Sequence, residues 1–129
     1  MSDSEKKKIF MVDDSKVHLN VVANMLKDRY EIIGAVSGKK ALELLKNGVI
    51  PDLILLDILM PDMDGWNLYK RIKSIGELHY VPIAFLTSQH GEEDEKNALH
   101  LGADDYIVKP FNKEDLLRRI EAIINKSKK

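Results

Sequence analysis

Five short runs of apolar residues alternate along the chain with longer segments in which apolar residues recur every three or four positions. Short apolar runs are typical of buried strands, and the spaced pattern is typical of amphipathic helices. The runs lie at residues 9–12, 30–36, 53–56, 81–86 and 106–108. Strands that alternate with helices across short connections predict an α/β domain, with a doubly wound parallel sheet of five strands covered by five helices.

Capping residues and glycines set the expected limits of the helices. Ser15 and Asn112 can cap the first and the last helix, because their side chains accept hydrogen bonds from free backbone N–H groups. The fourth helical segment, between residues 91 and 102, begins with four acidic residues and leaves only three apolar residues to bury, namely Ala98, Leu99 and Leu101. We therefore expect this helix to be the least firmly packed.

The third apolar run, LILL at residues 53–56, is followed directly by an acid, Asp57. A strand that is buried on both faces gives no packing reason for a carboxylate at its end. Ligands of open α/β sheets bind beyond the carboxyl ends of the strands, which is where Asp57 is expected to lie. Pro61 and Gly65 then break the strand and turn the chain. Asp57 is therefore a candidate active-site residue.

Three further strands also end in polar residues. Asp13 and Asp14 follow the first strand, Thr87 follows the fourth, and Lys109 follows the fifth. Each could have an ordinary structural role, such as a helix cap, a turn partner or a solvated side chain. Because parallel strands end at the same rim of a sheet, we expect the four residues to lie close to Asp57, and their joint occurrence favours a site.

Composition and charge restrict the classes of function. The 129 residues are the length of one domain, and 20 basic and 21 acidic residues give a net charge of −1. This balance argues against direct nucleic-acid binding, which needs a basic surface. Cysteine is absent, and no apolar stretch approaches the ~20 residues that span a bilayer. We expect a cytoplasmic protein with no membrane partner.

Electrostatics favours a divalent cation at the strand ends. Two carboxylates about 5 Å apart repel by about 3 kcal/mol at an effective dielectric constant near 20, so three clustered acids need a cation or must take up protons. Oxygen ligands suit Mg²⁺, which commonly accompanies phosphate. A carboxylate such as Asp57 can attack phosphorus and form an acyl phosphate. Lys109 would add a second cation, and the Thr87 hydroxyl could donate to a phosphoryl oxygen.

The chain resembles the receiver domain of two-component response regulators, in the single-domain form of the chemotaxis regulators, over residues of about 8–125. The motifs that carry the resemblance, in this order and spacing, are Val12-Asp13-Asp14, Leu56-Asp57, Met60-Pro61, Asp64-Gly65, Leu86-Thr87-Ser88, Gly102-Ala103-Asp104-Asp105-Tyr106 and Lys109-Pro110-Phe111. The resemblance implies a single receiver domain over residues 1–129. It also implies a flavodoxin-like sheet with the strand order 2-1-3-4-5.

The resemblance implies a phosphoryl-accepting signalling domain that catalyses only its own phosphorylation and dephosphorylation. Asp57 would take a phosphoryl group from a histidine kinase or a phosphotransfer protein. Asp14 and Asp57 would bind Mg²⁺ directly, with Mn²⁺ as a possible substitute. Asp13 would bind the metal through water, and the backbone carbonyl of Leu59 would complete the protein ligands.

The same resemblance assigns a switch. Thr87 and Lys109 would contact the phosphoryl oxygens, and Tyr106 would turn inward when Thr87 moves. The surface around the fourth helix, the fifth strand and the fifth helix would then shift. Leu59 and Gln89 occupy the two positions that tune dephosphorylation in this family. The apolar Leu59 side chain cannot orient a water molecule and Gln89 can, so the lifetime of the phosphorylated form stays open.

Several questions are left open by the sequence. It does not identify the donor kinase, the downstream output protein or domain, or the oligomeric state, and it leaves open whether these residues come from a longer protein. The histidines show no paired spacing for a metal and are interpreted as exposed or partly packed; they lie at positions 18, 79, 90 and 100.

Two other classes of protein share parts of the pattern. A flavodoxin-type electron carrier would have the same fold, but Asp13 and Asp14 would repel the flavin phosphate that binds after the first strand. A small Mg²⁺-dependent phosphohydrolase could use Asp57 as its nucleophile. It would normally need a cap that excludes water, and 129 residues leave no insertion for one.

Overall fold

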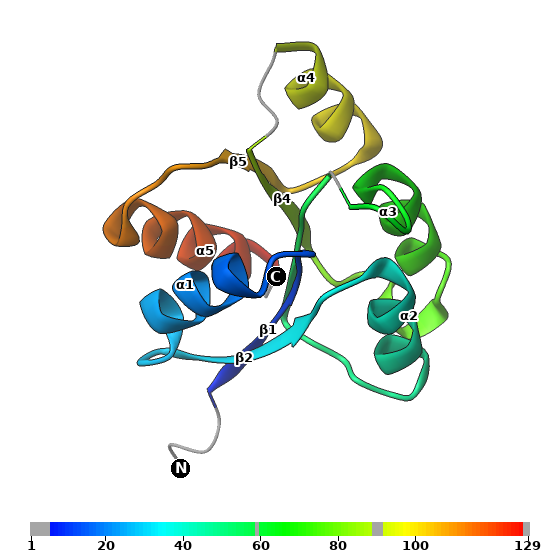
Figure 1. Ribbon diagram of the computed structural model, residues 1–129, viewed down its shortest axis with the longest axis horizontal. Helices are drawn as coiled ribbons and strands as arrows, with labels where there is room; N and C mark the ends of the chain where they lie inside the picture. The colour runs from blue at the N-terminus through cyan, green and yellow to red at the C-terminus, as the bar shows by residue number, and fades with distance from the viewer. Residues whose placement is uncertain (1–5, 59, 89–91, 128–129) are drawn as a thin grey trace.

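A computed structural model describes residues 6–58, 60–88 and 92–127, and its centre is a five-stranded parallel sheet (Figure 1). The strand order is β2-β1-β3-β4-β5, which confirms the predicted flavodoxin-like topology. The strands are β1 (Lys7–Val12), β2 (Tyr30–Ala35), β3 (Leu53–Leu56), β4 (Ile83–Thr87) and β5 (Asp105–Val108). The helices are α1 (Lys16–Leu26), α2 (Gly38–Lys46), α3 (Gly65–Lys73), α4 (Glu92–Leu101) and α5 (Lys113–Ser127), with a short 3₁₀ helix, η2 (Gly76–Leu78).

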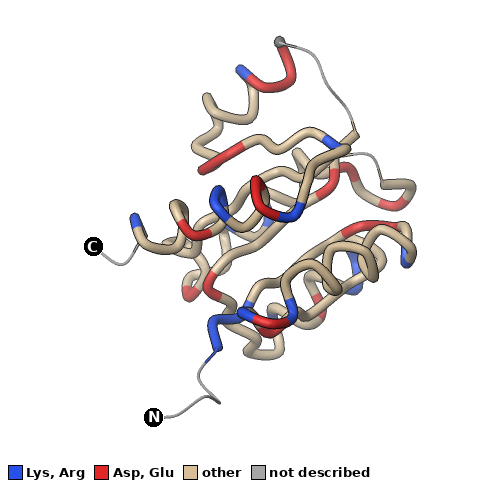
Figure 2. Tube along the Cα trace, turned by 90° about the vertical axis from the view of Figure 1, so that its left-hand side faces the viewer, with Lys and Arg blue, Asp and Glu red and all other residues tan. Residues whose placement is uncertain are grey.

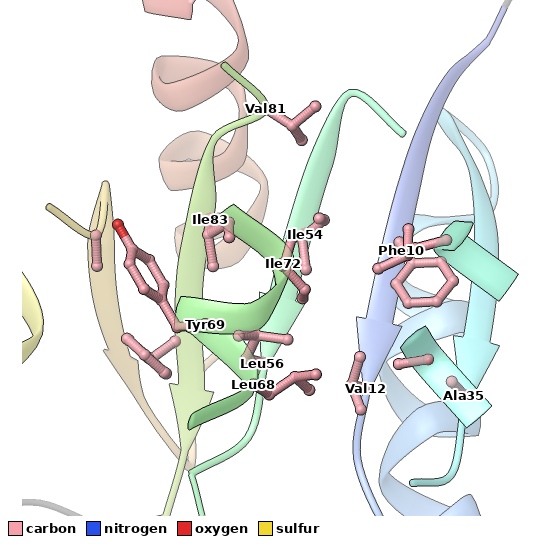
Figure 3. Packing of buried hydrophobic residues seen from close by; sticks show 14 of the residues in the cluster. Phe10, Val12, Ala35, Ile54, Leu56, Leu68, Tyr69, Ile72, Val81 and Ile83 are labelled. Carbon is pink, nitrogen blue, oxygen red and sulfur yellow. The ribbon is translucent and has the colours of Figure 1, made fainter. Parts of the chain in front are cut away.

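Helices cover both faces of the sheet. Figure 1 shows α1 and α5 together on one face and α2, α3 and α4 on the other. Alternate residues of a strand point to opposite faces, so each apolar strand packs against the helices on both faces of the sheet. Phe10 and Val12 pack towards α2 and α3, where Leu68 and Ile72 meet them (Figure 3). Met11 lies between Phe10 and Val12 in β1, and it packs on the opposite face of the sheet, in the apolar cluster that includes residues of α1 and α5. The core therefore holds the central strands from both sides.

The register of the central strands places their ends side by side. Val12 of β1 pairs with Leu56 of β3, and the backbone N–H of Asp57 donates to the carbonyl of Val12 at 3.0 Å. On the other side of β1, Val12 pairs with Ala35, and the N–H of Asp13 donates to the Ala35 carbonyl at 3.1 Å. The residues that follow β1 and β3 therefore leave the sheet at the same level.

The two predicted helix caps are confirmed. The Ser15 hydroxyl accepts a hydrogen bond from the N–H of His18 at 3.2 Å at the start of α1. The side-chain oxygen of Asn112 accepts from the N–H of Asp115 at 2.7 Å at the start of α5. Both contacts satisfy N–H groups that lack partners within the first helical turn.

Some elements differ from the prediction at their ends. Strand β4 begins at Ile83 rather than at residue 81, because Pro82 has no N–H to donate to a neighbouring strand. Strand β2 ends at Ala35 rather than at residue 36. Helix α3 ends at Lys73, and η2 follows it from Gly76. Among the described residues no helix is both long and apolar enough to cross a membrane.

Helix α4 buries fewer apolar side chains than the sequence suggests. Of its three apolar residues only Ala98 is buried, whereas Leu99 and Leu101 are 48% and 36% exposed. The expectation that all three are buried was wrong, because α4 lies at the margin of the sheet and faces it with little more than one small side chain. The expectation of a weakly packed helix agrees with this arrangement.

Candidate functional site

Three carboxylates meet at the carboxyl ends of β1 and β3. One oxygen atom from each of Asp13, Asp14 and Asp57 lies within 4.8 Å of the others. Asp13 is fully buried, Asp57 is buried and Asp14 is exposed, so the cluster opens towards solvent on one side. The structure thus brings together the three acids that the strand ends predicted. Oxygen ligands of this kind suit Mg²⁺.

Lys109 lies beside these acids and forms a largely buried ion pair with Asp13. Its ammonium nitrogen Nζ is 2.8 Å from the Oδ2 atom of Asp13, and the lysine side chain is only 14% exposed. The backbone fixes its position, because the N–H of Lys109 donates to the carbonyl of Thr87 at 2.9 Å. The Lys109–Pro110 peptide bond is cis. One ammonium against three carboxylates leaves the cluster negative, which suits a divalent cation.

Thr87 is the last residue of β4 and is fully buried. Its pairing with Val108 of β5 sets the level at which Lys109 leaves the sheet. The four strand ends that the sequence singled out therefore converge on one rim. This convergence follows from the parallel register and not from any local motif.

Tyr106 lies inside the protein and belongs to a row of aromatic rings. It is 4% exposed, and its ring centre is 6.3 Å from that of Phe85 on the neighbouring strand. Phe85 in turn contacts Trp66 of α3 at 5.0 Å and Tyr69 of α3 at 5.9 Å between ring centres. The Tyr69 hydroxyl donates to the carbonyl of Leu101 at the end of α4. The row joins β5, β4 and α3 and reaches the end of α4.

The buried phenol of Tyr106 gives a prediction about pH. Burial, together with the negative charges of Asp94 and Glu95, raises the pKa of Tyr106 from 10.0 to about 12. Because the folded protein disfavours the ionised phenol, the stability linked to the neutral form is complete below pH 10.0 and is lost as the pH rises towards about 12. Tyrosinate absorbance in an alkaline titration should show a late step that Tyr106→Phe removes. An unchanged titration curve for Tyr106→Phe would contradict this assignment.

The loop between β3 and α3 is tied to α2. The Asp62 carboxylate accepts hydrogen bonds from the N–H groups of Lys39 at 3.0 Å and Gly38 at 3.2 Å. The hydrogen bond from Lys39 is the main reason why the pKa of Asp62 lies below its usual range. The loop also contains Leu59, which lies outside the described residues, as does Gln89 after β4. The two positions predicted to tune dephosphorylation therefore stay predictions.

One residue of the site was not identified from the sequence. The Nδ1 atom of His18 is 3.1 Å from the Lys109 ammonium and 3.6 Å from Asp13 Oδ2. The sequence gives this histidine no partner at a metal-ligand spacing, which is why it is interpreted as exposed or partly packed. The available signal was its place in the first turn of the helix that follows the Asp13–Asp14 pair.

Comparisons with known proteins give a consistent result. A family model described as "Response regulator receiver domain" matches residues 9–121. The transcriptional regulatory protein CpxR of Escherichia coli (strain K12) is 37% identical over 121 residues, which cover 93% of this chain and 50% of CpxR. The chain therefore spans about half the length of this curated relative, and it spans a similar share, 52%, of the response regulator SaeR of Staphylococcus aureus (strain USA300).

Two solved structures have the same fold. The chemotaxis response regulator CheY4 of Vibrio cholerae aligns with a TM-score of 0.84 and 31% identity, covering 92% of this chain and 98% of that one. A CheY-like response regulator receiver domain protein of Methanospirillum hungatei JF-1 aligns with a TM-score of 0.87 and 29% identity, covering 96% and 98%. Both likenesses extend over nearly the whole chain.

Proposed function

The chain belongs to the response regulator receiver domain family, and we propose that it is a phosphoryl-accepting signalling switch in which Asp57 is the acceptor. The observation that carries the proposal is the meeting of Asp13, Asp14 and Asp57 within 4.8 Å at the carboxyl rim of the sheet, with Lys109 paired to Asp13. A nucleophilic carboxylate beside a cation is the arrangement that phosphoryl transfer to an acid requires.

The acidic cluster fits Mg²⁺, with Mn²⁺ as a substitute. Asp14 and Asp57 would hold the ion directly, Asp13 would hold it through water, and the backbone carbonyl of Leu59 would add a ligand. The bound ion would neutralise charge on the phosphoryl oxygens. The partly open side of the cluster, at exposed Asp14, suits Mg²⁺ because this ion usually keeps several waters.

In the proposed reaction a carboxylate oxygen of Asp57 attacks the phosphorus atom of the donor. A new oxygen–phosphorus bond forms and the bond between phosphorus and the leaving group breaks, so that Asp57 becomes an acyl phosphate. Lys109 stabilises the negative charge from the side of Asp13. The Thr87 hydroxyl donates to a phosphoryl oxygen and thereby senses its arrival.

Thr87 and Tyr106 form the proposed switch. Moving a two-state equilibrium from 1:99 to 99:1 needs about 5.5 kcal/mol. Hydrogen bonds to a charged group contribute about 1.5 to 3 kcal/mol each, so contacts from Thr87 and Lys109 can supply a bias of this size. Helix α4 is the element that can respond at low cost, because among its described apolar residues only Ala98 is buried. The surface of α4, β5 and α5 would carry the signal.

The proposed phosphoryl donor is a histidine kinase or a phosphotransfer protein, and the reader of the signal is a downstream protein or domain. We propose a single receiver domain over residues 1–129, cytoplasmic, without direct nucleic-acid contact and with no catalysis beyond its own phosphorylation and dephosphorylation. The mixture of acidic and basic residues along the chain, with acids gathered at the start of α4, supports the absence of a nucleic-acid surface (Figure 2). The family match does not favour a phosphohydrolase or an electron carrier.

The test is phosphorylation of the chain by acetyl phosphate, followed by intact mass. With Mg²⁺ we expect one added phosphoryl group per chain, and with a chelator in place of Mg²⁺ we expect at least a tenfold slower reaction, because the clustered carboxylates then repel the anionic donor. Equal incorporation without the metal would contradict the proposed metal site. Release of inorganic phosphate at many equivalents per chain, with rapid turnover, would instead indicate a phosphohydrolase.

A further inference from the structure

We propose that His18 is a positioning residue that fixes the Lys109 ammonium at the phosphorylation site. The inference rests on the proposed function of Asp57 and deepens it. His18 comes from the first turn of α1, far along the chain from Lys109, and was not singled out by any motif. Its ring reaches the one lysine that the site contains among the described residues.

The contact joins three elements of the structure. The Nδ1 atom of His18 lies 3.1 Å from Lys109 Nζ, and Lys109 Nζ lies 2.8 Å from Asp13 Oδ2. The backbone of His18 is itself fixed, because its N–H donates to the Ser15 hydroxyl that caps α1. The lysine is thus held by an acceptor at the end of β1 and by another in the first turn of α1.

Two acceptors restrict a lysine much more than one. The ammonium group ends a flexible chain of four carbons and has three N–H bonds to donate. With Asp13 alone, the group could pivot about a single contact. With Asp13 and His18 together, two donors have fixed directions, and the third is directed by the tetrahedral geometry of the nitrogen. Such a fixed direction is what a preorganised cation at a phosphoryl group requires.

As a hydrogen bond, the contact requires one tautomer of the histidine ring. Lysine can only donate, so the Nδ1 atom must accept, and the single ring proton of the neutral imidazole must be on Nε2. The ring could instead have a packing role. It lines a small apolar pocket beside α1, together with Val21, Met25 and Phe111. A packing role in that pocket would need the ring's shape but not its acceptor atom.

Two variants separate these roles. His18→Asn places its Oδ1 atom the same number of bonds from the backbone as Nδ1 and keeps an acceptor. His18→Leu keeps apolar bulk and removes the acceptor. Because the His18 side chain is half-exposed at 49%, we expect a moderate effect, a threefold to tenfold slower phosphorylation of His18→Leu by acetyl phosphate with Mg²⁺, or about 0.7 to 1.4 kcal/mol. His18→Asn should remain within about twofold of wild type.

Nitrogen-15 NMR provides a readout that does not depend on phosphorylation. In the wild type we expect the ring proton on Nε2, and we expect the Lys109 ammonium protons to exchange with water at least about threefold faster in His18→Leu than in wild type or His18→Asn. His79→Leu is the matched control, because the described ring contact of His79 is with Tyr80, outside the site. It should leave both readouts unchanged.

Each outcome decides between the alternatives. A ring proton on Nδ1, or unchanged Lys109 exchange in His18→Leu, would overturn the proposal. Impairment of His18→Asn with His18→Leu close to wild type would show that the ring acts by packing in the apolar pocket, and would overturn the proposal. If the wild type itself takes up no phosphoryl group, the proposed function fails, whereas the NMR comparison still decides whether His18 holds Lys109. Thermal unfolding of each variant identifies any loss of fold.

Discussion

Replacing Asp57 by asparagine should abolish phosphorylation of the chain by acetyl phosphate. The amide has nearly the shape of the carboxylate, but its oxygen is a poor nucleophile and cannot form a stable acyl phosphate. Of the two other acids in the cluster, Asp13 is paired with Lys109 and Asp14 is exposed, so we expect neither to replace the buried Asp57 as the acceptor. Intact mass in the presence of Mg²⁺ should show one added phosphoryl group on the wild type and none on Asp57→Asn.

A control separates lost chemistry from lost structure. Asp28→Asn removes an exposed carboxylate from the turn before β2 and should be phosphorylated like the wild type. Asp57→Asn should also unfold at the same temperature as the wild type or higher when a chelator is present, because it removes one of three mutually repelling charges. A phosphoryl group on folded Asp57→Asn would show that the acceptor has been assigned wrongly.

Replacing Gly65 by alanine should destabilise the protein by about 3 kcal/mol, the upper end of the usual cost of overpacking. A Cβ atom at Gly65 would lie 2.4 Å from the backbone oxygen of Asp57 and 2.8 Å from the Cα atom of Ile58. These are backbone atoms, held by the hydrogen bond from the Gly65 N–H to the Ile58 carbonyl at 2.8 Å. The helix propensity gained by alanine, at most about 1 kcal/mol, cannot offset such a contact.

Denaturant unfolding measures this effect. The matched variant is Gly76→Ala, since among the described residues no atom beyond its chain neighbours lies within 4 Å of a Cβ atom at that position, and its stability should stay within about 0.5 kcal/mol of wild type. Because the crowded atoms belong to Asp57 and its neighbour, Gly65→Ala should also slow phosphorylation of the protein that remains folded. Equal stability of Gly65→Ala and wild type would mean that the loop can relax away from α3.

Much of the fold could be predicted because it depends on patterns that are local in sequence. The run 53–56 and the caps Ser15 and Asn112 each satisfy a rule about one segment, and the parallel arrangement follows from the alternation of strands and helices. The extent of α4's burial depends on where the helix lies relative to the sheet. Leu99 and Leu101 are two of the three apolar residues that α4 offers for burial, but α4 lies at the margin of the fold and leaves both partly exposed.

The site could be predicted in part for the same reason. Polar residues at strand ends converge because the strands are parallel, so the meeting of Asp13, Asp14 and Asp57 needed only the strand ends. Contacts that a side chain makes with another element carry no such signal. The hydrophobic and polar pattern of the sequence predicts neither the contact of His18 with Lys109 nor the hydrogen bonds that Asp62 accepts from α2.

The aromatic row also has an optical consequence. Trp66 is the only tryptophan of the chain, and its indole lies 5.0 Å from Phe85, whose ring neighbours Tyr106. A rearrangement of Tyr106 changes the surroundings of Phe85 and hence of the indole, because close-packed rings move together. A change in the intrinsic fluorescence of Trp66 should therefore report the proposed rearrangement of Tyr106. Trp66 lies at the opposite end of the aromatic row, so the unlabelled protein can be followed in real time.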